Sequence, residues 1–415
     1  MKFVNPKIAQ EPDPVDAWYR YYAGYSAAFV EKALKEVAPK AQRVLDPWNG
    51  TGTTTVVAAS NKVSAIGFDI NPAMVVVARA RLLGRGVWAS IAPLSADIVG
   101  HTNELNIDDD PLRFWFSDRS AATIRALQSS VHRLLVDTGA TGYPSFNYAS
   151  TMSTLAAFFY TALFRTVRLL LTPVAGTNPT WWKRLKESER LDLERTIIFD
   201  TFISSTRELA EGLHRANFDV AVQTMVDVGN CRQLSVPDQS VDAVITSPPY
   251  CTRIDYGIST LPELAVLGAH EKVVKMLRDT MVGTPTMTGE DAMEESWGPK
   301  AASFLRDVAK HDSKASSGYY TKYYRQYYSG MHSSLGELRR VTRPGGAVVL
   351  VVQDNYYKEI HNDTPGILME MARANGFGRV ARFNFQVSRT MASLNPRARQ
   401  HRARTTAVES VLVLR

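Results

Sequence analysis

The tetrapeptide Ser-Pro-Pro-Tyr at Ser247–Tyr250 is where residue types and spacing in this sequence most clearly suggest chemistry. Two successive prolines fix their φ angles and remove two backbone donors. A carbonyl oxygen and the serine oxygen are thereby held as acceptors for an amino group, so that catalysis there would be mainly positioning. The tyrosine adds a face on which a planar ring can stack. The alternative is a proline-rich strand exit without a ligand.

A glycine-containing turn, Asp46–Thr54, suggests a binding site for a polar ligand. Glycines directly after a strand permit positive φ and let a ligand approach the backbone closely. The following helix presents its N-terminus to a polar group. The spacing is not that of the dinucleotide fingerprint, and the turn lacks the lysine of a phosphate-binding loop, which disfavours nucleoside triphosphates. A tight turn without a ligand is the alternative.

Asp69 follows these glycines at the end of the next apolar run. An acid about 20 residues beyond such a turn can accept hydrogen bonds from both hydroxyls of a ribose. The alternative is a turn or helix-capping aspartate before Asn71 and Pro72. The glycine turn upstream favours the ribose interpretation.

These residues need strands that end at one edge of a sheet. Strand, helix, strand and helix within the first α/β segment predict a parallel sheet. Seven strands are expected, near residues 43–46, 63–69, 220–225, 240–246, 347–353, 380–387 and 408–414. Helices are expected near 18–37, 53–60, 72–83 and 365–375, and the last two strands predict an antiparallel hairpin. Residues 98–217 show helical periodicity and are interpreted as a helical insertion between 1–97 and 218–415, which would form one α/β domain.

Three segments, Asp46–Thr54, Phe68–Pro72 and Thr246–Tyr250, resemble in their order the amino-methyltransferases of DNA, which make N4-methylcytosine or N6-methyladenine. The resemblance covers roughly 15–97 and 218–415. It implies a Rossmann-like class I methyltransferase fold, with a mainly parallel seven-stranded sheet and an antiparallel last strand. It also implies S-adenosyl-L-methionine (AdoMet) as methyl donor and DNA as substrate, with the target base flipped out of the duplex.

The resemblance also implies a role for individual residues. The methionine part of AdoMet would be surrounded by Asp46, Asn49, Gly50, Thr51, Gly52 and Thr53, the ribose held by Asp69 and the adenine flanked by Ile70. The target base would be held by Ser247, Pro248 and Tyr250, which with Pro249 form the catalytic tetrapeptide.

Two further assignments stay open. The segment Tyr21–Phe29 sits where the family has another cofactor-contacting motif, and a core helix is the alternative. The family often has an aspartate after the third strand that meets the adenine amino group. Asn230 takes that place here, and Asp97 is its rival.

The identity of the methylated base is left open by two opposing features. The serine of the tetrapeptide is similar to the cytosine N4 type, whereas placing the cofactor motif first resembles many adenine N6 enzymes. Cytosine N4 is favoured. One rival is an RNA base methyltransferase similar to the tRNA guanine enzymes, disfavoured because only about 40 residues precede the first strand. Another is an inactive DNA-binding protein on the same scaffold.

Contacts to nucleic acid are expected from the connection Ser388–Thr405, which contains no acid. Arginine clusters suit phosphate binding, and this one consists of Arg389, Arg397, Arg399, Arg402 and Arg404. A solvated loop is the alternative. Six tyrosines in Tyr319–Tyr328 are interpreted as packing on the sheet rather than as base-stacking groups. The helical insertion has the size for a target-recognition element.

Composition sets wider limits. The chain has 415 residues and a net charge of +7, compatible with a polyanionic partner. Two cysteines, Cys231 and Cys251, have no zinc-site spacing, so no metal is expected. No secretory signal or membrane-spanning run is evident. We expect a soluble, cytoplasmic protein without membrane contact, with a restriction endonuclease as a candidate partner and the oligomeric state open.

Overall fold

The structure is a computed structural model. It describes residues 1–7, 13–19, 24–105, 107–137, 146–178, 180–216, 222–287, 289, 292–386 and 407–415. Among these residues, every helix is too short or too polar to cross a bilayer.

Seven strands of the described residues form one mixed sheet in the order β3-β2-β1-β4-β5-β9-β8. Their bounds are β1 Arg43–Asp46, β2 Ser64–Asp69, β3 Thr224–Val228, β4 Val241–Thr246, β5 Thr342–Gln353, β8 Val380–Gln386 and β9 Val408–Leu414. The pairs from β3 to β5 are parallel, whereas β9 is antiparallel to both β5 and β8. The expected mainly parallel class I methyltransferase sheet with an antiparallel last strand is therefore confirmed.

Helices cover the two faces of this sheet, and β5 shows how the sequence separates them. Ala347, Val349 and Val351 pack with α1 (Ala27–Val37) and α2 (Thr53–Ser60) on one face. Val348, Leu350 and Val352 alternate with them and pack on the other face, with α11 (Pro299–Lys310), α12 (Thr321–Val341) and α13 (Thr364–Ala374). Because successive side chains of a strand point to opposite faces, a continuous apolar run marks a strand buried on both sides.

Some boundaries differ from those expected. The first helix, expected from residue 18, begins at Ala27, because the Ser26 side chain accepts the Phe29 amide and caps it there. The third sheet strand begins at Thr224 rather than 220. A small hairpin of β6 (Asn355–Tyr357) and β7 (Ile360–Asn362) was not predicted, because strands of three residues carry little periodic signal.

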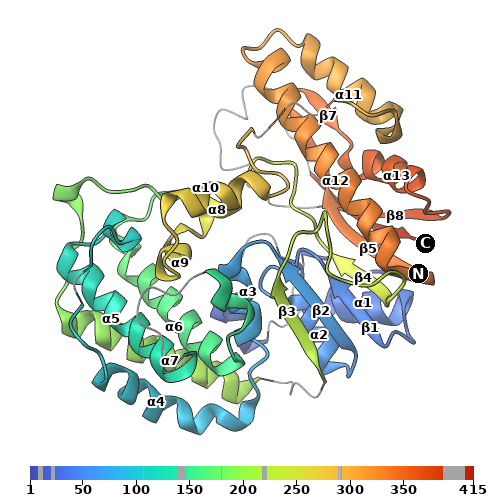
Figure 1. Cartoon of the computed structure of the whole chain (residues 1–415). Helices are drawn as coiled ribbons and strands as arrows, with labels where there is room; N and C mark the ends of the chain where they lie inside the picture. Colours follow the sequence, from blue (N-terminus) through green and yellow to red (C-terminus); the bar gives the residue numbers. More distant parts are fainter. Residues whose placement is uncertain are drawn as a thin grey trace.

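A group of helices follows α3 (Pro72–Ala80) and lies on the left in Figure 1, opposite α11–α13. It contains α4 Trp88–Gly100, α5 Asp118–Leu135, α6 Thr154–Leu170 and α7 Arg195–Arg215. Its core is continuous with α3, through side chains such as Phe158 and Phe159 of α6. The helical insertion at 98–217 stays a proposal, and its first boundary falls within α4, so the helical group of the structure begins about ten residues earlier, at Trp88.

The strand order reverses at β1, which lies between β2 and β4. In open α/β sheets, ligands bind outside the carboxyl ends of the strands at such a point. The segments after β1, β2 and β4 are those that carry the glycine turn, Asp69 and the tetrapeptide. The topology therefore brings together three motifs that lie up to 200 residues apart in the chain.

Candidate active site

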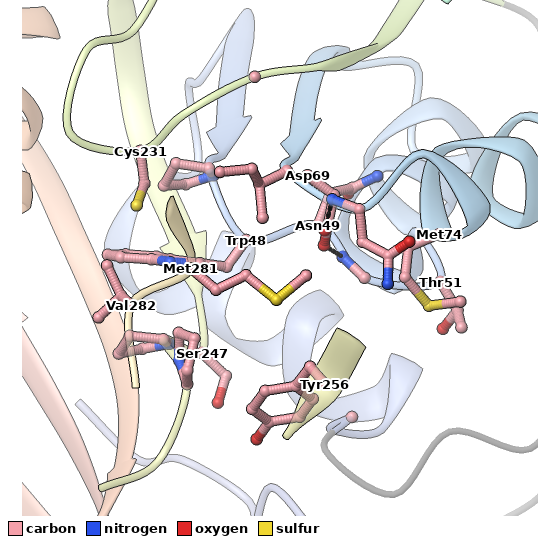
Figure 2. Close-up of a pocket in the computed structure, with 18 of the residues that line it drawn as sticks. Trp48, Asn49, Thr51, Asp69, Met74, Cys231, Ser247, Tyr256, Met281 and Val282 are labelled. Atoms are coloured by element: carbon pink, nitrogen blue, oxygen red, sulfur yellow. Dashed lines mark hydrogen bonds between the residues drawn. The ribbon is translucent and has the colours of Figure 1, made fainter. Parts of the chain in front are cut away.

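An open cavity lies at the carboxyl ends of the strands, and it brings together most of the residues singled out in the sequence (Figure 2). Those lining it are Asn49, Gly50, Thr51, Thr53, Asp69, Ile70, Ser247, Pro248 and Pro249. Figure 2 shows Ser247 and Tyr256 on one side, Asp69 and Asn49 on the other, and Met281 between them. The cavity therefore joins the predicted cofactor motifs to the predicted catalytic motif.

The glycine turn after β1 forms one wall of the cavity, and its backbone conformation depends on two glycines. Gly50 has φ 49° and Gly52 has φ 86°, both in the left-handed region that glycine adopts most easily. A Cβ on Gly52 would lie 2.9 Å from the Cβ of Ala78 in α3, so the two elements meet at a position that only glycine fits. The turn is further held by Arg81, whose Nη1 donates to the Thr51 carbonyl at 2.8 Å.

Asp69 is held by two backbone amides. Gly50 N donates to Oδ2 at 2.9 Å, and Asn71 N donates to Oδ1 at 2.8 Å. Burial raises the pKa of Asp69 to about 6, although these two amides favour the charged form. Each carboxylate oxygen can accept more than one hydrogen bond. The group can therefore still accept two donors from the cavity.

Asn49 is a largely buried residue of the cavity wall with an unpartnered donor. Its side chain is 5% exposed, and its Oδ1 accepts a hydrogen bond from the Thr55 hydroxyl at 3.2 Å. Its Nδ2 is buried and has no partner among the described residues. Buried donors in folded proteins almost always have an acceptor. This Nδ2 lies against Gly67 of β2, where an added Cβ would be 2.6 Å away, so contact with a molecule in the cavity would need a rotation of this side chain.

Asp46 and Gly52 do not line the cavity. Asp46 is 1% exposed and accepts hydrogen bonds from Tyr25 Oη, Thr246 Oγ1 and Trp48 N. Burial raises the pKa of this carboxyl. Asp46 thus ties the end of β1 to the end of β4 from behind the cavity wall. Its expected contact with the cofactor remains a prediction.

Within the segment Tyr21–Phe29, some residues lie at the cavity, as a cofactor-contacting motif would, and others lie in the core. Gly24 and Tyr25 line the cavity, whereas Phe29 is completely buried under the sheet. Burial raises the pKa of Tyr25 well above its usual value, and the neighbouring Asp46 adds to this. Tyr25 therefore stays protonated and can donate its hydroxyl to Asp46. Residues 20–23 lie outside the described residues.

Ser247 directly follows β4, and its hydroxyl proton is engaged in a hydrogen bond within the protein. Its Oγ donates to the Val351 carbonyl on β5 at 3.0 Å. The Pro249 carbonyl accepts the Tyr327 hydroxyl at 3.0 Å. No donor of the described residues reaches the Pro248 carbonyl. The serine oxygen and the Pro248 carbonyl are thus left as acceptors beside the cavity.

Tyr250 lies next to the cavity but does not line it. Its hydroxyl donates to the Glu409 carboxylate on β9, and the Lys7 ammonium lies 5.2 Å from its ring centroid. Burial raises the pKa of Tyr250 well above its usual value, and Glu409 adds to this. The expected stacking of a base on this ring remains a prediction.

The end of β3 differs in detail from the arrangement expected. Gly229 and Cys231 line the cavity, but Asn230 does not. Its Oδ1 instead accepts the Arg232 amide at 3.0 Å within the turn. The rival Asp97 is exposed on α4, away from the cavity. The contact of Asn230 with an adenine amino group therefore remains a prediction that needs a side-chain rotation.

Several cavity residues outside the predicted motifs had no signal in the sequence: Met74, Tyr256, Thr260, Met281 and Val282. The last four belong to the segment after the tetrapeptide, which contains α8 (Tyr256–Ser259), α9 (Leu261–Val266) and α10 (Glu271–Thr280). This segment is fixed over the cavity by Asn71, whose Nδ2 donates to Thr260 Oγ1 at 2.7 Å. Its proximity to Tyr250 in the chain was the one available indication.

The tyrosine-rich segment packs as expected for four of its members. Tyr323, Tyr324, Tyr327 and Tyr328 are buried between α12 and its neighbours, which confirms the packing interpretation. Burial raises the pKa of each of the four well above its usual value.

Two expectations concern charged groups. The arginines predicted to bind nucleic acid, Arg389, Arg397, Arg399, Arg402 and Arg404, lie outside the described residues. Within the part of the chain that is described, no three His, Cys, Asp or Glu side chains are placed to hold a metal ion.

Comparison with known proteins gives consistent similarities. A family model described as DNA methylase matches residues 7–79. The type II methyltransferase M.BsoBI of Geobacillus stearothermophilus is 23% identical over 66% of this chain and 57% of its own length. M.AvaI of Nostoc sp. is 22% identical over 70% of this chain and 61% of its own length. M.MvaI of Kocuria varians is 23% identical over 85% of this chain and 80% of its own length. The matches to M.BsoBI and M.AvaI thus span about three fifths of those proteins. No solved structure matches significantly.

Proposed function

We propose that this chain, which is similar to DNA methylases, transfers a methyl group from AdoMet to the exocyclic amino group of a base in DNA. The observation that carries this proposal is the single cavity shared by the glycine turn, Asp69 and Ser247. A cofactor held at the first two would present its methyl group toward the third.

The cavity fits AdoMet on the side of β1 and β2. Asp69 has acceptor capacity for two ribose hydroxyls, and Ile70 lies beside it for contact with the adenine. Asn49 and the turn Gly50–Thr53, which line the cavity, would surround the methionine part. AdoMet when bound supplies an electrophilic methyl carbon, whose bond to sulfur breaks as a new bond to nitrogen forms, with the electron pair left on sulfur.

Ser247 and Pro248 would orient the amino group. With its own proton donated to Val351, the serine oxygen can only accept in this arrangement, which suits an –NH₂ donor. The Pro248 carbonyl offers the second acceptor. Two such hydrogen bonds fix both N–H directions and thereby the direction of the nitrogen lone pair. Positioning of this kind can lower a barrier by several kcal/mol, and the proton released after transfer passes to solvent.

Cys251 is not used in this chemistry. It is 3% exposed, it does not line the cavity, and burial raises the pKa of its thiol above the usual value. A thiol nucleophile needs a lowered pKa and access to its substrate. The arrangement therefore supports methylation of an amino nitrogen rather than of a ring carbon.

The substrate proposal is a base flipped out of duplex DNA. Arg253 lies three residues beyond Tyr250 and is exposed, with its guanidinium 5.3 Å and 5.0 Å from the ring centroids of Tyr319 and Tyr320. Its Nη1 donates to Tyr320 Oη at 2.9 Å. This arginine can face a phosphate beside the cavity, and we propose the same task for the five arginines of Ser388–Thr405.

The helical region would complete the DNA-binding surface. It is bound to the segment over the cavity by buried Arg125, whose guanidinium donates to the Ala265 and Val266 carbonyls and pairs with Asp110. We propose that residues 98–217 contact the sequence around the target base.

Cytosine N4 is the proposed target, because of the serine in the tetrapeptide, and adenine N6 is the second candidate. The test incubates the protein with DNA or RNA and methyl-labelled AdoMet, followed by mass spectrometry of the nucleosides. Label on N4-methylcytosine from DNA is expected. Label on adenine would correct the base, label only in RNA would refute the DNA assignment, and no label in either would refute the enzyme.

A further inference from the structure

Glu409 is a carboxylate in a position where the fold otherwise places apolar residues. It lies in β9, whose sequence from Val411 to Leu414 is entirely apolar and buried. Its side chain is 0% exposed, and the residue pairs in register with Gln353 on β5 and Phe385 on β8. Burial of an acid costs several kcal/mol unless partners compensate for it. A strand that is paired on both sides therefore retains this residue at a cost to stability.

The partners of Glu409 all belong to the environment of Tyr250. Its Oε1 accepts the Tyr250 hydroxyl and lies 3.9 Å from Lys7 Nζ. Lys7 in turn lies 5.2 Å from the Tyr250 ring centroid and donates to the carbonyl of Gly24, a cavity residue, at 2.9 Å. The second carboxylate oxygen, Oε2, is buried without a partner in the described residues. The polar contacts of Glu409 are thus made with Tyr250 and Lys7 and not with the side chains of its own strand.

From these contacts we infer that Glu409, assisted by Lys7, is a positioning residue that fixes the ring of Tyr250 for the target base. This inference rests on the proposed function and extends it to residues outside the three motifs.

The ring is restrained at both of its ends. The backbone before Tyr250 is set by two prolines and by the hydrogen bond from Tyr327 to the Pro249 carbonyl. The far end of the ring is held by the hydrogen bond to Glu409. The hydrogen bond fixes where the hydroxyl end of the ring lies and thereby restricts χ1, and Lys7 lies beside the ring. A base that stacks on a fixed ring loses less entropy on binding than one that must order it.

The test is a double-mutant cycle on the full chain. Glu409→Leu should lower kcat/KM for DNA about tenfold, and Tyr250→Phe, which removes only the hydroxyl, should do the same. The double variant should be no less active than either single variant, because each substitution removes the same hydrogen bond between Tyr250 and Glu409. Glu409→Gln, which keeps an acceptor for the hydroxyl, should recover most of the activity. AdoMet binding by calorimetry should stay unchanged throughout.

Stability separates positioning from a structural role. Leucine suits β9, so Glu409→Leu should leave the thermal midpoint unchanged or raise it. Asp242→Asn, at the opposite end of β4, is the matched control and should lose stability without losing kcat per folded molecule. A hundredfold, additive loss in the double variant, or full activity of Glu409→Leu, would overturn the inference. Failure of the unmutated protein to methylate DNA would instead refute the proposed function.

Discussion

The Gly50 amide donates a 2.9 Å hydrogen bond to Oδ2 of Asp69, which joins the turn after β1 to the end of β2. One wall of the cavity is therefore built from two motifs that hold each other. The carboxylate that would bind the ribose is already oriented, because its other oxygen accepts the Asn71 amide. Changes at Asp69 should thus affect ligand binding more strongly than a single lost contact would suggest.

Asp69→Ala should weaken AdoMet binding about a hundredfold. Hydrogen bonds to a charged group contribute about 1.5–3 kcal/mol each, and the variant loses those to the ribose. Isothermal titration calorimetry with AdoMet measures the effect, and circular dichroism verifies that the variant is folded. Asp97→Ala, on an exposed face of α4, is a control that should bind AdoMet normally. Equal affinity in both variants would refute the ribose assignment.

AdoMet binding should also depend on pH through Asp69. Burial raises the pKa of this carboxyl to about 6, above its usual value, so protonation begins at a higher pH than for an exposed aspartate. The ionised form is the better acceptor for two hydroxyls. Affinity should therefore be full above pH 7 and fall as the pH drops through 6. Asp69→Asn should bind weakly at every pH, and a pH-dependent affinity in that variant would assign the titration to another group.

Gly52→Ala tests the fit between the turn and α3. Alanine at φ 86° costs about 1–2 kcal/mol, and its Cβ would lie 2.9 Å from the Cβ of Ala78. We expect a lower midpoint of thermal unfolding together with weaker AdoMet binding. Gly86→Ala, where a Cβ meets nothing within 4 Å, is the matched control. A Gly52→Ala protein as stable as this control would show that α3 can move away at little cost.

Ser247→Ala should slow methyl transfer strongly while sparing the binding of the cofactor. The variant loses one of two acceptors for the amino group, and groups that position a substrate in this way are worth about a hundredfold in kcat. The buried Val351 carbonyl also loses its donor. Single-turnover methylation measures the rate, and calorimetry should show unchanged AdoMet binding. A rate close to that of the unmutated protein would leave the Pro248 carbonyl as the main acceptor.

The sheet could be predicted from the sequence because most of its strands are short apolar runs, and β1, β3 and β4 are followed within two residues by proline or glycine. The alternation on β5, with Val349 toward α1 and Val348 toward α12, is encoded directly in the residues. The three motifs follow strand ends, so their meeting point followed from the topology of parallel sheets. The cavity was in this sense predictable before any contact was known.

The remaining parts of the site depend on contacts that no local pattern reports. Glu409 lies 159 residues from Tyr250, and neither residue predicts the other. The segment after the tetrapeptide has no periodicity that would place Thr260 against Asn71. Asn230 shows the converse case, because its place in the order of motifs suggested a ligand contact, whereas its side chain closes its own turn. Short polar side chains often bind neighbouring backbone in this way.

The segment over the cavity should depend for its stability on Glu263. This acid of α9 is completely buried, and its carboxylate accepts a hydrogen bond from the guanidinium of Arg168 in α6. The same guanidinium also donates to the Ser259 carbonyl at 2.9 Å. Burial tends to lower the pKa of Arg168, but Glu263 and Tyr19 outweigh it and raise this pKa above its usual value. The ion pair thus connects the helical region to the elements that carry Tyr256 and Thr260.

Glu263→Gln should cost about 2–4 kcal/mol of unfolding free energy, because removing one partner leaves the other charge poorly solvated. Asp192→Asn breaks the pair with Arg119, in which both side chains are 57% exposed, and should leave the midpoint unchanged. Urea unfolding followed by tryptophan fluorescence compares the two variants. Because Thr260, directly before α9, lines the cavity, Glu263→Gln should also raise the KM for DNA. A stable variant with an unchanged KM would show that α9 is held by its apolar side chains alone.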